Sequence, residues 1–442
     1  MKLSTQGYKG TRDFYPEDKR LQKYMFDVMR RVVERFGYQE CDAPSIEPVE
    51  LYMGKTSQEI VSEQTFVFID RGGRTVTLRP EMTPSVSRMV AARRQELAYP
   101  LRWYSLPALW RYERPQAGRL REHWQLNVDL FGIAGLEAEH EVMLIADLIM
   151  KEFGATPQMY EIRLNSRQLV NHILHERLQL DQFQALALVR LMDKLGKISD
   201  KEFTTAAETV LGSGQKSQDT VESLLDILKA KNLSELPLEL QQHPAARELD
   251  QLMEMLTASG VSSTVFTPGL IRGFDYYTNI VFEVFDLHPG NNRSMFGGGR
   301  YDSLVSAFGV EPVPTVGFGM GDVTLQEFLK AHKLLPRLKP ETDAVVVLVG
   351  DDVYGQAQKT LATLRGEGLR LAVDATGRRT GDQLKSAAKA GIRYAIIIGE
   401  HEIVSGRLKL KDLASGEEQD LAPERVISKL AGRHKPEQEL ID

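Results

Sequence analysis

Cysteine is nearly absent from this sequence, since Cys41 is the only one among its 442 residues. A single thiol excludes disulfides within the chain and zinc sites built from cysteine clusters. Long apolar runs are absent too: stretches such as residues 344–349 fall far short of the ~20 residues that span a bilayer. The N-terminal segment holds no apolar block typical of a secretion signal. We therefore expect a soluble, cytoplasmic protein without a membrane partner.

A large excess of either charge is also missing. Lys and Arg number 55 against 61 Asp and Glu, for a net charge of -6, so overall charge does not point to a nucleic acid or a membrane as partner. A hydrophobic fraction of 42% excludes a mainly disordered chain. The length corresponds to about three domains of ~150 residues each.

Apolar periodicity gives the first elements. Apolar residues at three- and four-residue steps predict a helix over residues 16–36, which Gly37 ends. Short strands and helices follow. One of these helices is predicted to start at Thr83-Pro84, where Thr83 can cap it and Pro84 fits the first turn.

The middle of the chain indicates a domain that is interrupted and then resumed. Residues 166–260 carry helical patterns with little strand signal. After them, residues 276–285 and 296–301 return to strand-like sequence punctuated by glycine. We therefore predict one domain over residues 1–330, with a helical insertion at 166–260.

A second domain is predicted at the C-terminal end. The stretch from Leu334 to Asp343 carries prolines and charge typical of a linker, which we place at residues 331–342. The pattern that follows alternates strand, helix, strand, helix and strand. This order predicts a small α/β domain with a largely parallel sheet over residues 343–442.

One segment, residues 103–132, combines an alternating polar pattern with an arginine-rich loop at residues 114–122. In two antiparallel strands, its in-phase polar residues would share one face: Arg111, Glu113, Gln125, Asn127 and Asp129. One interpretation is a solvated sheet face with a basic loop. The other is a site for a ligand that carries phosphate, because the planar guanidinium binds phosphate oxygens in two places at once.

Within this segment, RYERPQAGRLRE resembles motif 2 of the class II aminoacyl-tRNA synthetases, in the form of the histidyl-tRNA synthetase family. LIRGFDYYTNIVFEV, over residues 270–284, is similar to the histidine-binding signature of that family. GTRDFYP, LRPEMTPSV, GGGRYDSLV and GDQLKSAAKAGIRYAIIIGE extend the resemblance over nearly the whole chain. The resemblance implies an α+β fold: a class II antiparallel catalytic sheet with a helical insertion, followed by an α/β anticodon-binding domain.

The resemblance also implies an activity. The family joins histidine to ATP as histidyl-adenylate and then transfers histidine to the 3′ end of histidine tRNA. Both steps depend on positioning and charge neutralisation more than on a protein nucleophile. By resemblance, Arg111 and Arg272 are the catalytic residues at the α-phosphate, Glu113 holds the adenine end, and Arg119 meets the outer phosphates. Mg²⁺ is expected with ATP, and its ligands stay unassigned.

Recognition of L-histidine is assigned by the same resemblance. The amino group and its surroundings would contact Glu81, Thr83 and Gln125. The imidazole would contact Asp129, Tyr276 and Tyr277, while Arg272 would meet the carboxylate. The residue pattern alone leaves plainer alternatives, in which Thr83 only caps a helix and the two tyrosines only fill a core.

Further partners follow from the family. Arg114 and Gln116 of the motif 2 loop would lie near the acceptor end of the tRNA. Arg378 and Arg379 would contact the anticodon. The segment around Pro44 resembles motif 1, which in this class lies at a dimer interface, so a homodimer is expected.

Two positions depart from the family pattern. Thr324 stands where motif 3 normally carries an arginine for the ATP γ-phosphate, and Arg293 and Arg300 are candidate substitutes. His123-Trp124 precedes Gln125 where Phe-His is more usual, so we expect the wall of the pocket to differ.

Other functions stay open on these grounds. The missing motif 3 arginine leaves a regulatory paralogue as the alternative, one that binds histidine or tRNA without forming adenylate. A dinucleotide-binding loop is a weaker one, because the glycines at 317, 319 and 321 do not have the G-x-G-x-x-G spacing. His172, His175 and Glu176 suggest a metal site only weakly, since no further ligand lies nearby.

Overall fold

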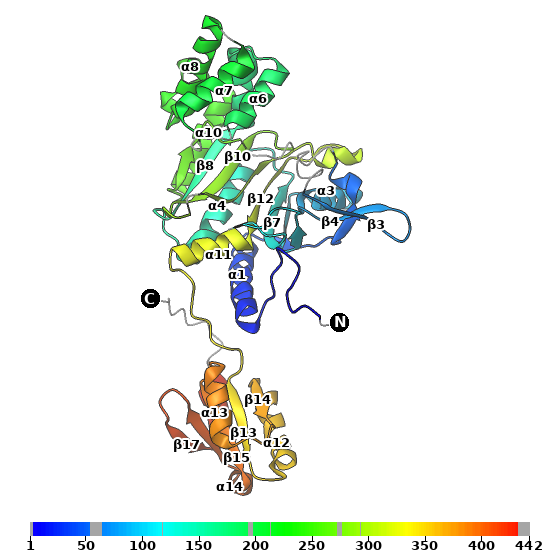
Figure 1. The fold of residues 1–442 in the computed structure, drawn as a ribbon, viewed down its shortest axis with the longest axis vertical. Coiled ribbons are helices and arrows are strands. Elements are labelled where there is room, and N and C mark those ends of the chain that lie inside the picture. Colours follow the sequence, from blue (N-terminus) through cyan, green and yellow to red (C-terminus); the bar gives the residue numbers. More distant parts are fainter. Residues whose placement is uncertain are drawn as a thin grey trace. The chain divides into compact units, whose positions relative to one another are not determined.

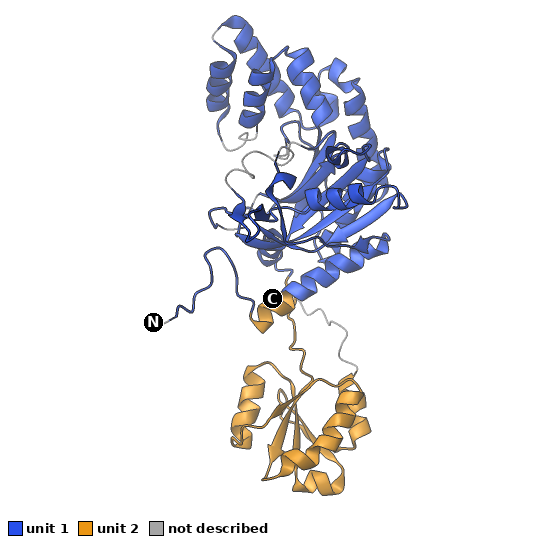
Figure 2. Cartoon of the chain, turned by 90° about the vertical axis from the view of Figure 1, so that its right-hand side faces the viewer, with its two compact units in different colours: residues 1–14, 22–334 blue, residues 15–21, 335–442 orange. Residues whose placement is uncertain are grey.

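The structure is a computed structural model that describes residues 3–53, 64–116, 118–192, 198–212, 214–271, 276–291 and 293–431. The chain divides into two compact units, residues 1–14 with 22–334 and residues 15–21 with 335–442 (Figure 2). The finer domain boundaries predicted from the sequence stay predictions. No helix among the described residues is long and apolar enough to cross a membrane.

Unit 1 is built on one large, mostly antiparallel sheet (Figure 1). The spatial order is β1, β5, β7, β12, β11, β10, β8 and β9, with β6 paired to β7 beside this path. The outer neighbours β1–β5 and β8–β9 are parallel, and the inner ones are antiparallel. The bounds are β1 Gln39–Glu40, β5 Leu101–Ser105, β6 Ala108–Trp110, β7 Glu122–Phe131, β8 Tyr160–Ser166, β9 Thr264–Phe266, β10 Ile280–Asp286, β11 Ser294–Arg300 and β12 Thr315–Gly321.

The helices of unit 1 bury the apolar stripes that the sequence pattern predicts. The first, α1 (Pro16–Arg35), buries a stripe at three- and four-residue steps: Met25, Val28, Met29, Val32 and Val33. Gly37, with φ of 79°, lets the chain turn after it. Among the helices that contact the sheet are α4 (Glu137–Glu152) and α11 (Asp322–Ala331). The predicted first helix is therefore confirmed to within one residue at its end.

The segment between β8 and β9 is helical, as the sequence predicts. Because β8 and β9 pair in parallel within the same sheet, the helices interrupt one domain without ending it. In Figure 1 the green helices α6, α7 and α8 form a group of their own. The bounds are α5 Arg167–Asn171, η2 His172–Arg177, α6 Gln182–Met192, α7 Asp200–Leu211, α8 Gln215–Lys229, η3 Leu233–Glu235, α9 Leu238–Gln241 and α10 Pro244–Ala258.

A small second sheet in unit 1 has the order β2 (Ile46–Pro48), β4 (Thr75–Leu78), β3 (Phe66–Ile69). The short helices η1 (Val49–Leu51) and α3 (Thr83–Ala92) follow β2 and β4 in the chain. The capping role expected for Thr83 is wrong. Met82 occupies the N-cap position without a side-chain cap, and Thr83 is already the first helical residue.

Unit 2 has the predicted alternation of strands and helices, β13 to β15. These three strands are parallel neighbours in the order β14, β13, β15, and an antiparallel hairpin of β16 and β17 extends the sheet beyond the prediction. The bounds are β13 Ala344–Val349, α12 Val353–Gly366, β14 Leu371–Asp374, α13 Thr380–Lys389, β15 Tyr394–Gly399, α14 Glu400–Ser405, β16 Leu408–Asp412, β17 Glu418–Leu421 and α15 Pro423–Leu430.

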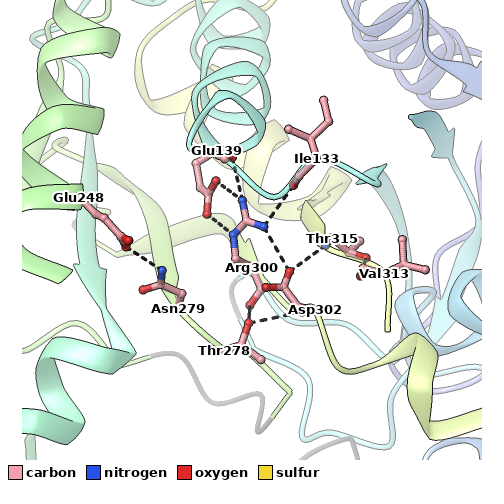
Figure 3. Close-up of polar contacts among 10 residues, drawn as sticks. Ile133, Glu139, Glu248, Thr278, Asn279, Arg300, Asp302, Val313 and Thr315 are labelled. Atoms are coloured by element: carbon pink, nitrogen blue, oxygen red, sulfur yellow. Dashed lines mark hydrogen bonds and ion pairs between the residues drawn. The ribbon is translucent and has the colours of Figure 1, made fainter. Parts of the chain in front are cut away.

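A buried ion pair fixes the end of β11 to the start of α4 (Figure 3). Arg300 donates from Nε and Nη2 to the two carboxylate oxygens of Glu139, both at 2.6 Å. Its Nη1 and Nη2 also donate to the backbone oxygens of Ile133 (3.3 Å) and Gly135 (3.0 Å). The side chains of Arg300 and Glu139 are only 5% and 1% exposed. Breaking one partner of such a pair leaves an uncompensated buried charge.

We predict that Glu139→Gln lowers the free energy of unfolding of unit 1 by about 3 to 5 kcal/mol. All three tryptophans lie in this unit, so their fluorescence in a urea titration reports on it. The control is Arg35→Gln, which removes an exposed pair with Glu152 (57% and 30% exposed) and should cost less than about 1 kcal/mol. Equal losses in the two variants would contradict the prediction.

Candidate active site

The floor of a cavity in unit 1 is bare backbone. In the register of β11 and β12, Gly297 faces Gly319 and Gly299 faces Gly317. A Cβ added at Gly317 would lie 2.6 Å from Oδ1 of Asp129, and one at Gly319 would lie 2.5 Å from Nε2 of Gln125. At Gly317 the backbone oxygen of Val128 would also lie 2.5 Å away, so glycine is required there, whereas a Cβ at Gly319 would displace the Gln125 amide.

Polar side chains of β7 form one wall beside this floor. Gln125, Asn127 and Asp129 lie opposite Gly321, Gly319 and Gly317 of β12, so the predicted shared face is confirmed. Gln125 and Asn127 line the cavity. Asp129 is buried and accepts a hydrogen bond from the hydroxyl of Tyr301, which itself lines the cavity.

Three tyrosines form the opposite wall. The ring of Tyr276 lies 4.9 Å from that of Tyr277 and 5.6 Å from that of Tyr301. The Tyr276 hydroxyl donates to Oε2 of Glu81 at 3.1 Å. All three tyrosines are buried in a common cluster, yet all three line the cavity, so filling the core and facing the cavity are compatible. The strand predicted over residues 276–285 begins only at Ile280, and both predicted tyrosines precede it.

The cavity brings together most of the residues assigned to histidine. Glu81, Thr83, Gln125, Tyr276 and Tyr277 all line it, and Arg111 lies with them. The Nε of Arg111 is anchored to the backbone oxygen of Pro80 at 3.0 Å. Among the described lining residues, Arg111 is the one cation, which places positive charge beside polar groups that can bind an amino acid. Arg272 lies outside the described residues.

Two polar side chains that line the cavity were not assigned to the site from the sequence. Tyr301 directly follows GGGR within GGGRYDSLV, and Asn127 belongs to the alternation of β7. Both signals were available in the sequence. His123 and Trp124, expected to alter the wall, are not among the lining residues. Trp124 instead packs edge-on against Phe14, with the ring centroids 5.2 Å apart.

Burial sets the ionisation of the groups around the cavity. It raises the pKa of Asp129 to about 7, although the hydrogen bond from Tyr301 opposes this shift. The pKa of Tyr301 is raised well above its usual value by burial and by the neighbouring Asp129. Burial lowers the pKa of His123 to about 3, helped by the charges of Arg111 and Arg12. His123 is therefore neutral near pH 7.

The loop between β6 and β7 carries the remaining motif 2 residues. Arg111 and Glu113 were expected within a strand, but β6 ends at Trp110. Glu113 pairs with Arg119 at 3.6 Å between Oε2 and Nη1. The side chains of Arg114, Gln116 and Arg119 are exposed, so the loop presents guanidinium groups as predicted.

In unit 2, Arg378 and Arg379 lie just before α13. Arg378 donates to Asp374 (2.8 Å) and to Ser386 (3.1 Å), while Arg379 is exposed. Hydrogen bonds from Thr376, more than the Arg378 contact, lower the pKa of Asp374. Arg378 is thus engaged within its own loop.

The two candidate substitutes for the motif 3 arginine, which Thr324 replaces, lie in different surroundings. The Thr324 hydroxyl donates to the backbone oxygens of Met295 (2.9 Å) and Gly321 (3.3 Å). Arg300 is wrong as a substitute, because Glu139 and backbone oxygens hold its guanidinium in the interior (Figure 3). Arg293 instead pairs with Glu327 of α11.

No group of three or more His, Cys, Asp or Glu able to hold a metal occurs among the described residues. Nδ1 of His172 contacts Glu176 at 2.9 Å, and its ring lies 4.3 Å from that of His243. His175 contacts the backbone oxygen of Leu180. Gly317 and Gly319 lie within β12 and not in a loop that could cradle a dinucleotide.

An antiparallel sheet with a glycine floor, an arginine in its cavity and a helical segment between β8 and β9 defines unit 1 as the catalytic fold of a class II aminoacyl-tRNA synthetase. Unit 2 has the α/β fold that the resemblance predicts for the domain after the catalytic one.

Comparisons give the family. Residues 10–323 match the family described as Histidyl-tRNA synthetase, and residues 343–433 match the Anticodon binding domain. The chain is 42% identical over 415 residues to a histidine–tRNA ligase of Leptospira biflexa, covering 94% of each chain. It is 36% identical over 427 residues to that of Thermoplasma volcanium, covering 95% of this chain and 98% of the relative. The chain therefore belongs to the histidyl-tRNA synthetase family.

A solved structure agrees on the fold. The crystal structure of histidyl-tRNA synthetase from Nostoc sp. PCC 7120 matches with a TM-score of 0.81 at 24% identity. The match covers 98% of this chain and all of that one.

We predict that Asp129→Asn changes how stability depends on pH. A pKa near 7 in the folded state, against about 3.9 when unfolded, means that the folded chain holds this proton more tightly. The parent should therefore lose about 2 to 3 kcal/mol of unfolding free energy relative to Asp129→Asn between about pH 5 and pH 8. Urea titrations at both pH values measure the difference.

The matched control is Asp27→Asn, at a side chain that is 61% exposed, and it should follow the parent. If the unfolding free energies of the parent and Asp129→Asn differ by the same amount at both pH values, the raised pKa of Asp129 is contradicted.

Proposed function

We propose that this chain is a histidine–tRNA ligase, which activates L-histidine with ATP and transfers it to histidine tRNA. The single observation that carries the proposal is the cavity itself. It holds a guanidinium, Arg111, among the carboxylate of Glu81, the amide of Gln125 and a wall of tyrosines. Membership of the histidyl-tRNA synthetase family supports the same activity.

In the proposed first step, a carboxylate oxygen of histidine attacks the α-phosphorus of ATP. The bond from that phosphorus to the bridging oxygen breaks, and pyrophosphate leaves. Negative charge grows on the α-phosphate oxygens during this step. Arg111 and Arg272 are proposed to neutralise that charge, which a preorganised cation does without further reorganisation. Glu113 would hold the adenine end of ATP, and Arg119 would meet the outer phosphates.

Recognition of histidine uses both polar walls of the cavity. The carboxylate of Glu81, already oriented by the Tyr276 hydroxyl at 3.1 Å, would pair with the ammonium group, beside Thr83 and Gln125. Asp129, Tyr276 and Tyr277 would surround the imidazole. A site built to hydrogen-bond a polar side chain rejects analogues that lack it, because its own buried groups would stay unpaired.

In the proposed second step, a ribose hydroxyl at the 3′ end of the tRNA attacks the carbonyl carbon of histidyl-adenylate, and AMP leaves. Arg114 and Gln116 on the exposed loop would contact the acceptor end. Arg379, together with Arg378, would contact the anticodon, a role that the match to an anticodon-binding domain supports.

Mg²⁺ is proposed to enter bound to the phosphates of ATP, as part of that substrate. The described residues hold no group of three or more His, Cys, Asp or Glu that could bind a metal. We place the reaction in the cytoplasm.

Histidine-dependent exchange of pyrophosphate into ATP tests the proposal against the regulatory alternative, in which the chain binds histidine or tRNA without forming adenylate. A ligase exchanges label only when histidine is present and then charges histidine tRNA. Folded chain that binds histidine but exchanges no label would support the regulatory alternative instead.

We predict that Gly319→Ala weakens exchange at least tenfold, because a Cβ at 319 would lie 2.5 Å from the Gln125 amide and force it out of place. The loss should appear mainly as a higher KM for histidine. The matched control is Gly321→Ala on the same strand face, where the nearest atom would be 3.6 Å away. Gly321→Ala should exchange at nearly the parent rate, and equal losses in both would contradict the role of this floor.

We also propose a homodimer formed through the region around Pro44. Apolar side chains are exposed there on β2 and β3, with Ile46 at 49% and Phe68 at 41%, and large apolar groups of this kind favour an interface.

The dimer proposal predicts that Ile46→Glu combined with Phe68→Glu halves the mass measured by light scattering after gel filtration. Phe183→Glu, at a side chain that is 78% exposed on α6, is the control and should leave the mass unchanged. A parent chain that already runs as a monomer would rule the dimer out.

A further inference from the structure

The missing positive charge at position 324 raises the question of which group replaces it. Thr324 lies in the first turn of α11, and its hydroxyl donates to the backbone oxygen of Met295 in β11 at 2.9 Å. A side chain at 324 therefore lies against the start of β11. Any substitute cation should come from this neighbourhood.

Arg293 stands at that place. It directly precedes β11, two residues before Met295, and its Nη2 pairs with Oε2 of Glu327. Glu327 follows Thr324 by three residues on α11, and residues at this spacing share one face of a helix. The guanidinium of Arg293 is thus held beside the turn of α11 where the family carries its own arginine.

The motif 2 loop meets the same pair. The backbone N–H of Gly118 donates to Oε1 of Glu327 at 3.0 Å. A Cβ added at Gly118 would lie 2.8 Å from Nη1 of Arg293, so the loop passes directly over the guanidinium. Gly118 directly precedes Arg119 in the sequence. The motif 2 loop and Arg293, which precedes β11, therefore both contact the carboxylate of Glu327 on α11.

This arrangement has the chemistry of an anion site. The Glu327 carboxylate accepts from a backbone amide in a glycine turn and from a guanidinium, and both donors also bind phosphate oxygens. The side chains of Arg293 and Glu327 are 34% and 31% exposed, so a polyphosphate chain can reach them from solvent. Arg300, in contrast, is held in the interior.

We propose that Arg293 binds the outer phosphates of ATP and supplies the charge that Thr324 lacks. This inference rests on the proposed ligase function. Glu327 holds the guanidinium in position before ATP arrives, and the phosphates then share or take over that contact. The competing explanation is purely structural: Arg293 and Glu327 only fasten the motif 2 loop.

The test compares two ligands on the full chain. Arg293→Gln removes the charge, so affinity for ATP should fall about tenfold to a hundredfold, as expected for a lost charge-assisted contact. A sulfamoyl analogue of histidyl-adenylate carries no outer phosphates, so its Kd should change by less than about twofold. If both affinities fall together, the residue only shapes the site. If neither falls, Arg293 does not bind phosphate.

Two further variants distinguish a role of Arg293 in binding phosphate from a role in fastening the motif 2 loop. Glu327→Gln should keep affinity for ATP at the parent level or higher, because the amide oxygen of glutamine still accepts a hydrogen bond that positions the guanidinium, while the negative charge that competes with phosphate is gone. A loss equal to that of Arg293→Gln would favour the structural explanation. Thr324→Arg placed in the Arg293→Gln background should recover at least about tenfold in affinity for ATP, and no recovery would count against the replacement of one cation by the other.

Measurements on the parent chain distinguish a failure of the ligase function from a failure of the role of Arg293. If it neither binds the adenylate analogue nor exchanges pyrophosphate, the ligase function fails. If the parent does both and Arg293→Gln behaves like it, only the role of Arg293 fails.

Discussion

The site depends on one constraint, which is that β11 and β12 present bare backbone beneath the side chains of β7 and the tyrosines. At Gly317 and Gly319 any side chain would come within about 2.6 Å of Asp129 or Gln125. Because Gly317 and Gly319 of β12 face Gly299 and Gly297 of β11, the two strands open a single continuous floor. The polar side chains of β7 can then lie beside this floor, because no side chain of β12 occupies the space next to them. The three glycines that line the cavity, Gly297, Gly317 and Gly319, thus leave the space in which a ligand can lie.

Electrostatics around the floor is organised by burial. Asp129 is fully enclosed and meets the Tyr301 hydroxyl, so its charge is costly and its pKa rises to about 7. Arg300, the residue before Tyr301, is neutralised by Glu139 in the interior. The exposed cations lie instead on the motif 2 loop and beside α11. Positive charge is therefore present both in the cavity, on Arg111, and outside its lining, on the motif 2 loop and beside α11.

Local patterns in the sequence predicted much of this arrangement. The alternation of Gln125, Asn127 and Asp129 fixed their common face, and the strand and helix order of unit 2 was readable from apolar runs. The contacts that the sequence did not predict join residues that lie far apart in the chain. Tyr301 meets Asp129 across 172 residues of sequence and Arg300 meets Glu139 across 161, so no neighbouring residue reveals either partnership. The capping role of Thr83 failed because tertiary packing places it in the cavity wall.

The most direct test is a crystal structure of the full chain with ATP and histidinol bound. The account predicts the imidazole of histidinol between the tyrosine wall and β7, with its amino group at Glu81 and the α-phosphate of ATP at Arg111. Both ligands should rest on the floor formed by Gly297, Gly317 and Gly319. An ordered complex in which either ligand lies elsewhere, or in which Arg111 turns away from the phosphate, would contradict it.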